Sequence, residues 1–246
     1  TYLKGNSRNA VQMAEQTQEF ITAKSDQPFF LYFATSDPHR GGGKDKNSKR
    51  THKPDLFGNK PDGKSHDGVE EIFYSPKDVP IPHFLSDTPE TREELAQYYQ
   101  SVSRIDQGLA RLVEILKEAK LYDKTMIVFT SDHGMAFAGG KTTVYEGGLK
   151  VPFVVRNPYE KNRGIKHSAL ISHIDITPSL LDFAGTLDPN KNRPKNWGDP
   201  KRSFPHPHTG GPKDHRGGTG KLSSYHRKSL IPLLRHPALQ HSHPSI

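Results

Sequence analysis

Residues Thr125-Met-Ile-Val-Phe-Thr-Ser-Asp-His-Gly134 decide the fold class of this chain. Positions 126–129 form a short, continuous apolar run of the kind that a buried parallel strand uses. The run is followed by a carboxylate, an imidazole and a glycine. In an open α/β sheet, ligands bind at the carboxyl ends of the strands, so we expect Asp132 and His133 to lie at a binding site.

An Asp beside a His, followed by a Gly that lets the backbone approach closely, suits a divalent cation bound by hard or borderline ligands. These three residues alone fit a simple turn equally well, with Asp132 capping the residues that follow. The next segment favours the metal interpretation. It begins at Lys141 and reads Lys141-Thr-Thr-Val-Tyr-Glu-Gly-Gly-Leu-Lys-Val-Pro-Phe153.

The order of these motifs resembles that of the sulfatases, a branch of the alkaline phosphatase superfamily. A further match lies upstream, where Pro28-Phe-Phe-Leu-Tyr-Phe-Ala-Thr-Ser-Asp-Pro-His-Arg40 precedes Val79-Pro-Ile-Pro82 and a helix from Thr88. These segments are most similar to the heparan N-sulfatase (sulfamidase) subgroup. The resemblance covers about residues 6–185, and again residues 229–234.

The resemblance implies two metal ligands. Asp132 would supply a ligand to a divalent cation, in the first place Ca²⁺, and His133 would occupy the neighbouring ligand position. The sulfamidase subgroup often has Asn where this chain has His133, and an imidazole also suits zinc or manganese. The identity of the metal therefore stays open at this point.

The resemblance also implies the residues that meet the substrate. Lys141 would donate to the sulfate and stabilise charge in the transition state. The subgroup has Arg at that position, and a lysine is a point charge where an arginine is a bidentate fork. His39 would hydrogen-bond the sulfate or the leaving-group atom and act as a general acid, although a turn histidine bonded to the backbone is the simpler interpretation of that residue alone. Arg40 would bind a substrate carboxylate or face solvent.

The candidate site can be stated by role. The predicted catalytic residues are His39 and Lys141. The predicted substrate-binding residues are His39, Arg40 and Lys141. The predicted metal ligands are Asp132 and His133.

The nucleophile is expected outside this chain. Cysteine is absent, which excludes disulfides and thiolate metal sites. In sulfatases the nucleophile is a formylglycine, made from Cys or Ser within C/S-x-P/A-x-R. One partial match, Ser203-Phe-Pro-His-Pro207, lacks the Arg and follows the metal motif, whereas the family places it before. We therefore expect a fragment whose formylglycine belongs to a parent protein, upstream of Thr1; a natural pseudo-enzyme is the alternative.

The predicted fold class is α/β: an alkaline-phosphatase-like, mostly parallel sheet flanked by helices, incomplete, with long irregular inserts. Strands are predicted at 29–34, 126–129 and 151–155. The inserts cover roughly residues 41–68 and 157–227, which are rich in Gly, Pro, Lys, Arg and His and poor in apolar periodicity.

Two regions are expected along the chain. Residues 1–185 would form a partial sulfatase catalytic domain that carries the C-terminal half of the site. Residues 186–246 would form a loop-rich, partly disordered segment and tail.

Three helices are predicted, at 10–22, 88–120 and 173–183. The second begins with a hydroxyl cap, a Pro at the first helical position and an acidic first turn. Apolar residues then recur at intervals of three and four: Leu95, Tyr98, Val102, Ile105, Leu109, Leu112 and Leu116. A coiled coil is the competing interpretation, but the spacing lasts few repeats and runs into a strand. The third helix resembles the sulfatase D-I-x-P-T-L-L segment and is expected to pack rather than to catalyse.

The charge of the chain limits its partners. A net charge of +8 and a pI of about 9.5 suit a sulfated polysaccharide, a nucleic acid or an acidic membrane surface, or reflect well-solvated loops. No aromatic RNA-binding strand, zinc-finger spacing or recognition helix favours nucleic acid. No apolar run approaches the roughly 18 residues of a membrane span.

The expected function is that of a metal-dependent sulfatase, which cleaves N- or O-linked sulfate from sulfated glycans such as heparan sulfate or from another sulfated small molecule. One alternative is a non-catalytic, basic protein that binds sulfated glycans. Another is a phosphatase or phosphodiesterase of the same superfamily. The resemblance implies a secreted, periplasmic or lysosomal protein, and the residues themselves leave the compartment and the oligomeric state open.

Overall fold

A computed structural model describes the chain over five ranges, residues 5–25, 27–41, 57–60, 64–161 and 163–186. The chain divides into two units, Thr1–Pro158 and Tyr159–Ile246. None of the helices in the described ranges is both long and apolar enough to span a membrane. The predictions for residues 203–207, 229–234 and the tail lie outside the described residues.

The first unit is built around a 30-residue helix, α3 (Pro89–Glu118), which confirms the predicted helix. The hydroxyl of Thr88 accepts a hydrogen bond from the Thr91 backbone N–H at 3.2 Å. Pro89 and Glu90 then supply the fixed backbone angle and the negative charge that favour a helix N-terminus. Local chemistry alone therefore sets where this helix starts.

The buried face of α3 is only partly the predicted apolar stripe. The outer turns bury the expected leucines, whereas some predicted core positions are only half-buried: Val102, Ile105 and Leu109. The middle of the helix instead buries residues four positions apart: Gln100, Arg104, Gly108 and Leu112. Polar side chains, among them also Ser101 and Ser103, therefore occupy much of the buried face in the middle of the helix.

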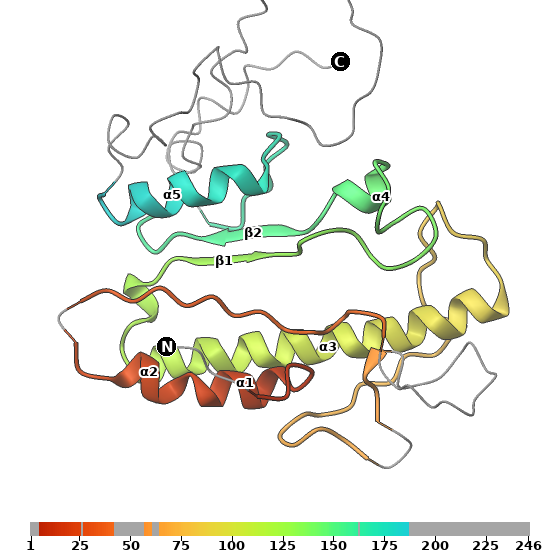
Figure 1. Ribbon diagram of the computed structural model, residues 1–246, viewed down its shortest axis with the longest axis horizontal. Coiled ribbons are helices and arrows are strands. Elements are labelled where there is room, and N and C mark those ends of the chain that lie inside the picture. Colours follow the sequence, from red (N-terminus) through yellow and green to blue (C-terminus); the bar gives the residue numbers. More distant parts are fainter. Residues whose placement is uncertain (1–4, 26, 42–56, 61–63, 162, 187–246) are drawn as a thin grey trace, which may run out of the picture. The chain divides into compact units, whose positions relative to one another are not determined.

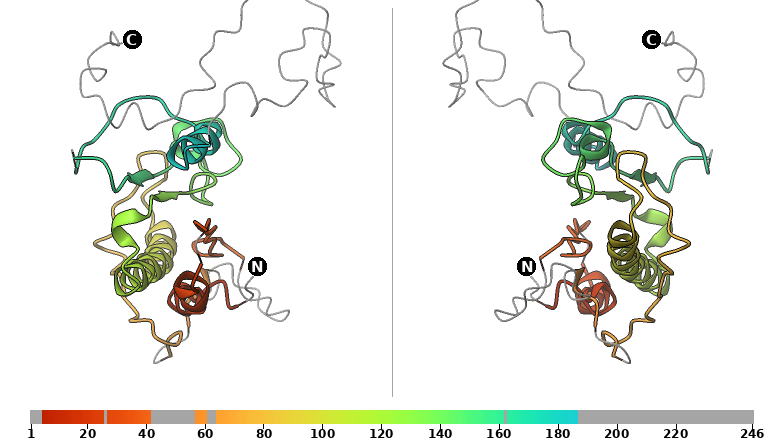
Figure 2. Two further views of the ribbon diagram at one scale, coloured as in Figure 1. Left: turned by 90° about the vertical axis from the view of Figure 1, so that its left-hand side faces the viewer. Right: turned by 90° about the vertical axis from the view of Figure 1, so that its right-hand side faces the viewer.

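Two short helices, α1 (Ala10–Gln16) and α2 (Gln18–Thr22), stand where one helix is predicted. The break falls at Thr17, whose hydroxyl donates to the Ala14 carbonyl oxygen at 2.7 Å. Helix α1 lies beside α3, and Figures 1 and 2 show the two side by side. The contact is close because Gly108 has no side chain: a Cβ atom there would overlap Ala10.

The core of this unit lies between the helices and an extended segment. Its buried members come from all three helices: Ala14, Ile21, Leu112, Ile115 and Leu116. Phe29, Leu31, Phe33 and Ile127 pack on them as half-buried neighbours. The stripe of α3 is therefore covered within this chain, and a coiled-coil partner is not needed to bury it.

The sheet of the described residues has two strands, β1 (Ile127–Thr130) and β2 (Phe153–Arg156). They pair antiparallel, from Ile127 opposite Arg156 to Thr130 opposite Phe153. The described residues therefore do not show the mostly parallel sheet that the sequence predicts; their two strands are antiparallel. A parallel pair needs a crossover of a dozen or more residues, usually a long helix. The connection here holds only the single turn α4 (Glu146–Leu149), so the chain returns beside the strand that it left.

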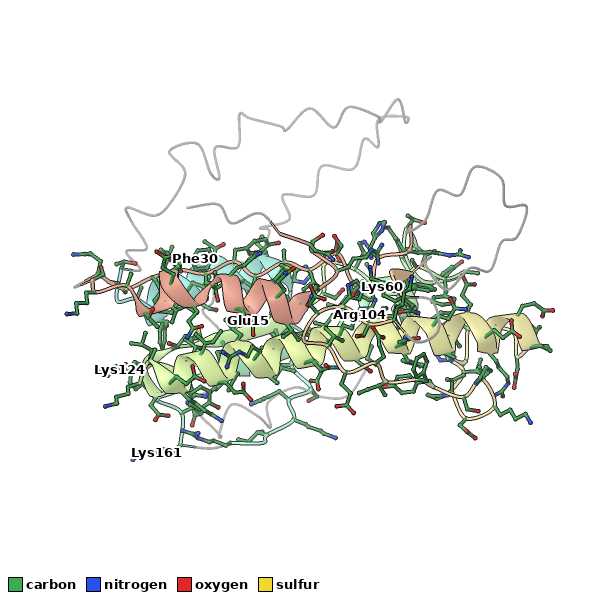
Figure 3. All side chains as sticks on the ribbon, turned by 90° about the horizontal axis from the view of Figure 1, so that it is seen from below. Glu15, Phe30, Lys60, Arg104, Lys124 and Lys161 are labelled. Carbon is green, nitrogen blue, oxygen red and sulfur yellow. The ribbon has the colours of Figure 1, made fainter. Side chains whose placement is uncertain are left out.

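The predicted strand at 29–34 is extended but pairs with no strand of the described residues. Its side chains alternate as in a strand. Phe29, Leu31 and Phe33 face the core. Phe30, labelled in Figure 3, and Tyr32 are 70% and 82% exposed. The sequence predicts a buried strand here; the segment is instead exposed on one face, and no strand of the described residues pairs with it.

Three further elements complete the described chain. The short helix η2 (Tyr122–Lys124) connects α3 to β1. In the second unit, η3 (His173–Asp175) runs into α5 (Ile176–Phe183), which confirms the predicted helix. A capping box formed by Ser172 and Asp175 starts this pair of helices.

Candidate active site

His39 and Lys141, which are 102 residues apart in the sequence, come together in the fold. The Lys141 Nζ lies 3.4 Å from the His39 Nε2. An ammonium group can only donate, so His39 accepts at Nε2 and carries its proton at Nδ1 in this arrangement. A cation and an imidazole side by side can bind an anion and exchange a proton with it.

The turn that carries His39 is anchored from below by a buried carboxylate, that of Asp37. Its two oxygens accept hydrogen bonds from Arg8 at 2.9 Å and from Arg104 at 2.8 Å. A second nitrogen of Arg8 donates to the His39 carbonyl oxygen at 2.9 Å. Arg8 therefore ties both ends of the turn together.

Burial raises the pKa of the Asp37 carboxyl group, and the hydrogen bonds and charges of Arg104 and Arg8 offset only part of that effect. The Asp37–Pro38 peptide bond that follows is cis.

Arg104 is a residue of this region that the predicted site lacks. It is fully buried on α3, as labelled in Figure 3. Besides Asp37, it donates to the Asn59 side-chain oxygen and to the Phe57 carbonyl oxygen, each at 2.7 Å. The carboxylate of Glu71 lies 3.9 Å away. One signal in the sequence points to it: Arg104 stands four positions before Gly108, on the same helical face.

Asp132 and His133 lie on the loop directly after β1, as the sequence predicts. The side chain of Asp132 is 82% exposed, and its carboxylate lies 3.3 Å from His133 Nε2. His133 Nδ1 lies 2.9 Å from the Gly134 carbonyl oxygen. A carbonyl can only accept, so Nδ1 carries the proton and Nε2 presents its lone pair on the side of the carboxylate.

That tautomer is the one that metal-binding histidines usually adopt, with the second ring nitrogen donating to a backbone carbonyl. The pair therefore fits a divalent cation held by one carboxylate oxygen and one imidazole nitrogen. Within the ranges that the structure describes, no group of three or more His, Cys, Asp or Glu side chains gathers to hold a metal ion.

The glycines of the two motifs bring the loops into backbone contact. Gly134 donates its N–H to the Gly148 carbonyl oxygen at 2.9 Å. A Cβ atom at Gly134 would overlap the carbonyl oxygen of Gly147. The Lys141 N–H bonds to the Met135 carbonyl oxygen at 2.8 Å. Backbone hydrogen bonds therefore join the Lys141 loop to the Asp132 loop, and one of them needs the close approach that Gly134 allows.

A family model described as Sulfatase matches residues 2–186. The chain belongs to the sulfatase family.

Individual relatives agree with this sulfatase assignment. Human N-sulphoglucosamine sulphohydrolase is 34% identical over 185 residues, which cover 72% of this chain and 35% of the human protein. An ulvan-active sulfatase of Formosa agariphila is 28% identical, over 65% of this chain and 29% of that protein. The chain thus spans about a third of the length of these curated relatives.

A solved structure supports the fold. The crystal structure of yidJ, a protein of Bacteroides fragilis assigned to the sulfatases, matches with a TM-score of 0.51 and 25% sequence identity. The match covers 76% of this chain and 38% of that one. The alkaline-phosphatase-like fold predicted from the motifs is therefore shown at the level of the family.

Thr142, next to Lys141 in this sulfatase chain, has a backbone φ of 68°. A β-branched residue in this left-handed region is rare and costs about 1–2 kcal/mol. Such strain persists only where the surroundings impose it, and it gathers at functional sites. The strained residue separates Lys141 from Thr143, whose hydroxyl donates to the Gly140 carbonyl oxygen at 2.7 Å.

An open pocket of about 510 Å³ lies beside Lys141. Its polar lining consists of Arg40, Thr91, Glu94, Lys141 and Thr142. Its apolar lining consists of Leu85, Ala136, Phe137 and Ala138. The sequence predicts that Arg40 binds a substrate carboxylate or faces solvent. In the structure its guanidinium pairs with a carboxylate of this chain, that of Glu94.

Proposed function

We propose that the intact protein is a metal-dependent sulfatase that hydrolyses N- or O-linked sulfate groups of sulfated glycans, and that this chain carries part of its active site. The observation that carries the proposal is the contact between Lys141 and His39. Membership of the sulfatase family gives that pair its chemistry. The sequence of the human relative makes N-sulfated glucosamine the first substrate to test.

The reaction breaks an S–O or S–N bond and places negative charge on the sulfate oxygens and on the leaving atom. Lys141 would neutralise one of the sulfate oxygens through its ammonium group. His39 would bind the leaving oxygen or nitrogen and protonate it as it departs. Both groups are attached to turns that buried contacts hold in place, so they are positioned before the substrate arrives.

Asp132 and His133 would hold the divalent cation, with Ca²⁺ as the first candidate, together with ligands from outside the described residues. When bound, the cation supplies positive charge to the sulfate oxygens. The chain contains no cysteine. We therefore propose that formylglycine, the nucleophile that the resemblance implies, is supplied by sequence outside this chain, as is the rest of a mostly parallel sheet.

The test starts with the gene. The transcript upstream of Thr1 is sequenced, and the complete reading frame is expressed and assayed for sulfate release from N-sulfoglucosamine, from a 6-O-sulfated sugar and from 4-nitrophenyl sulfate. A C/S-x-P/A-x-R motif upstream of Thr1, together with sulfate release, supports the proposal; Ser36-Asp-Pro-His-Arg40 of this chain fits the same letters but ends in the proposed substrate residues. Release of phosphate but not of sulfate from the matching phosphate esters would contradict it and favour a phosphatase.

The metal assignment has its own test. Asp132→Ala in the same protein should abolish the response of activity to added Ca²⁺, because the cation loses a carboxylate ligand. Ca²⁺ binding is measured in parallel by calorimetry. Unchanged binding in the variant would refute the assignment of Asp132.

A second function rests on the net charge of +8. A protein without the nucleophile would bind sulfated glycans through these charges and release no sulfate. Retention on immobilised heparin, combined with no turnover by the complete reading frame, would favour this binding role.

A further inference from the structure

The pocket beside Lys141 contains a charge that the predicted site does not use. Glu94 is on the first turns of α3, and its side chain is only 14% exposed. Its carboxylate contacts the Arg40 guanidinium. A half-buried carboxylate is costly unless a partner compensates it, and Arg40 is that partner.

Charge divides the pocket into two parts. Lys141, next to His39, is a cation suited to the reacting sulfate. The opposite charges of Arg40 and Glu94 also line the pocket and offset each other, and the remaining lining includes Leu85 and Phe137. This part of the lining therefore favours a group that is uncharged, hydrogen-bonding at its edge and apolar on its face. A sugar ring has these properties.

We propose that Glu94 is a specificity-determining residue, whose carboxylate accepts hydrogen bonds from hydroxyl groups of the sugar that carries the sulfate. The inference rests on the proposed sulfatase function and adds the substrate feature that the site recognises. A carboxylate has no hydrogen to donate, and it bonds best to donors such as hydroxyl groups. Arg40 holds that carboxylate in place and neutralises it. An uncharged sugar is thus preferred over one with an additional carboxylate or sulfate.

The experiment compares two substrates in the protein made from the complete reading frame. One is N-sulfoglucosamine, and the other is 4-nitrophenyl sulfate, which has no sugar hydroxyls. Glu94→Gln should lower kcat/KM for the sugar by about 10- to 100-fold, the range for a hydrogen bond to a charged group. It should change kcat/KM for the aryl sulfate by no more than about twofold.

Glu93→Gln is the matched control, because Glu93 is the preceding residue of the same helix, is exposed and does not line the pocket. It should leave both substrates within about twofold of wild type. An equal loss on both substrates in Glu94→Gln, or no loss on either, overturns the inference. Thermal unfolding is measured for each variant, and Glu94→Asp, which keeps the charge but shortens the reach, replaces Glu94→Gln if the latter does not fold.

A failure of the proposed function is recognised separately. If wild type releases sulfate from neither substrate, binding of N-sulfoglucosamine is measured by calorimetry instead. Weakening by tenfold or more in Glu94→Gln, on the order of one hydrogen bond to a charged group, supports the inference without catalysis. Unchanged affinity in the variant, or no binding by wild type, overturns it.

Discussion

Lys141 and His39 meet although each follows a different strand-like segment, and their contact gives them different hydrogen-bonding roles. The ammonium donates and the imidazole accepts, at 3.4 Å. In the proposed reaction, Lys141 would turn to the sulfate oxygens, and the freed Nε2 of His39 would take up the proton that it passes to the leaving group. Lysine in place of arginine would then hold the sulfate through a point charge rather than a bidentate fork.

Lys141→Ala in the intact protein is expected to lower kcat/KM for sulfate release by about 100- to 1,000-fold, because a positioned charge on the transition state is lost. Thermal unfolding should hardly change, since the side chain is partly exposed. Lys150→Ala is the control, because Lys150 is 76% exposed and pairs only with Glu146 on its own short helix. Unchanged kcat/KM in Lys141→Ala would contradict the role given to it.

Gly134→Ala should destabilise the first unit by about 1–3 kcal/mol, since the added methyl group overlaps the Gly147 carbonyl oxygen and the backbone has to move. Urea unfolding measures the change. Gly5→Ala is the control: there the methyl group meets only the end of the Gln16 side chain, which can rotate away. Equal stability of the two variants would mean that the loops are not packed as described.

At the scale of elements, helix α3 supports the site through Arg104. The helix is the longest element of the first unit (Figure 1), and the Arg104 guanidinium links it to the buried carboxylate of Asp37. The same side chain holds Asn59 and the Phe57 carbonyl oxygen. A segment near residue 57, the turn before His39 and the middle of α3 are thus joined at one buried point.

Arg104→Met should destabilise the unit by about 3–5 kcal/mol at neutral pH, because Asp37 is left buried with one partner fewer. The effect depends on pH. Burial already raises the pKa of Asp37, and loss of Arg104 raises it further. The folded variant then holds a proton that the unfolded chain has released, so its stability falls as the pH rises from acid toward the raised pKa.

Urea unfolding between about pH 4.5 and 7.5, above the ordinary pKa of an Asp, measures this slope. The deficit of Arg104→Met relative to wild type should grow with pH. Arg111→Met on the same helix is the control, since Arg111 forms surface pairs with Glu114 and Glu118 that contribute less than about 1 kcal/mol. A deficit independent of pH would show that Asp37 does not titrate as described.

The elements differ in how far the sequence predicts them. The start of α3 follows from Thr88-Pro89-Glu90, because a cap, a fixed backbone angle and a charge act within one turn. The pairing of β1 with β2 depends on how residues 131–152 fold back, and no local pattern encodes that. Arg104 is buried because three distant groups meet it, and polar burial of this kind is decided by tertiary contacts.

The candidate site shows the same division. The motifs place Asp132, His133, Lys141 and His39 on loops that follow strands or strand-like segments, and the structure puts each of them there. The contact between His39 and Lys141 links two motifs that sequence spacing alone cannot join. Glu94 has no motif of its own, since it stands among ordinary acidic residues in the second turn of α3, and only the pocket singles it out.

At the scale of the whole molecule, the chain spans about a third of its curated relatives, and part of its surface is apolar. Residues 29–34, Phe-Phe-Leu-Tyr-Phe-Ala, have high β propensity, no charge and no proline. Such a segment, extended and with Phe30 and Tyr32 exposed, is a site where strands of other molecules can add.

The isolated chain should therefore self-associate as its concentration rises. Tyr32→Lys should reduce this association, because a charge on an exposed strand edge opposes pairing. Light scattering over a dilution series measures it. Val144→Lys is the control, since Val144 is equally exposed, at 82%, but belongs to a loop. If both variants scatter as wild type does, residues 29–34 are not responsible.

The exposed Phe30 and Tyr32 also have a practical consequence. A fresh solution of the chain would be clear and would become turbid on storage. The turbidity would develop faster at high salt, which screens the positive charges of the chain. In a cell that produced the chain alone, it would also tend to aggregate. Chaperones and proteases would both act on the segment that exposes these two aromatic rings.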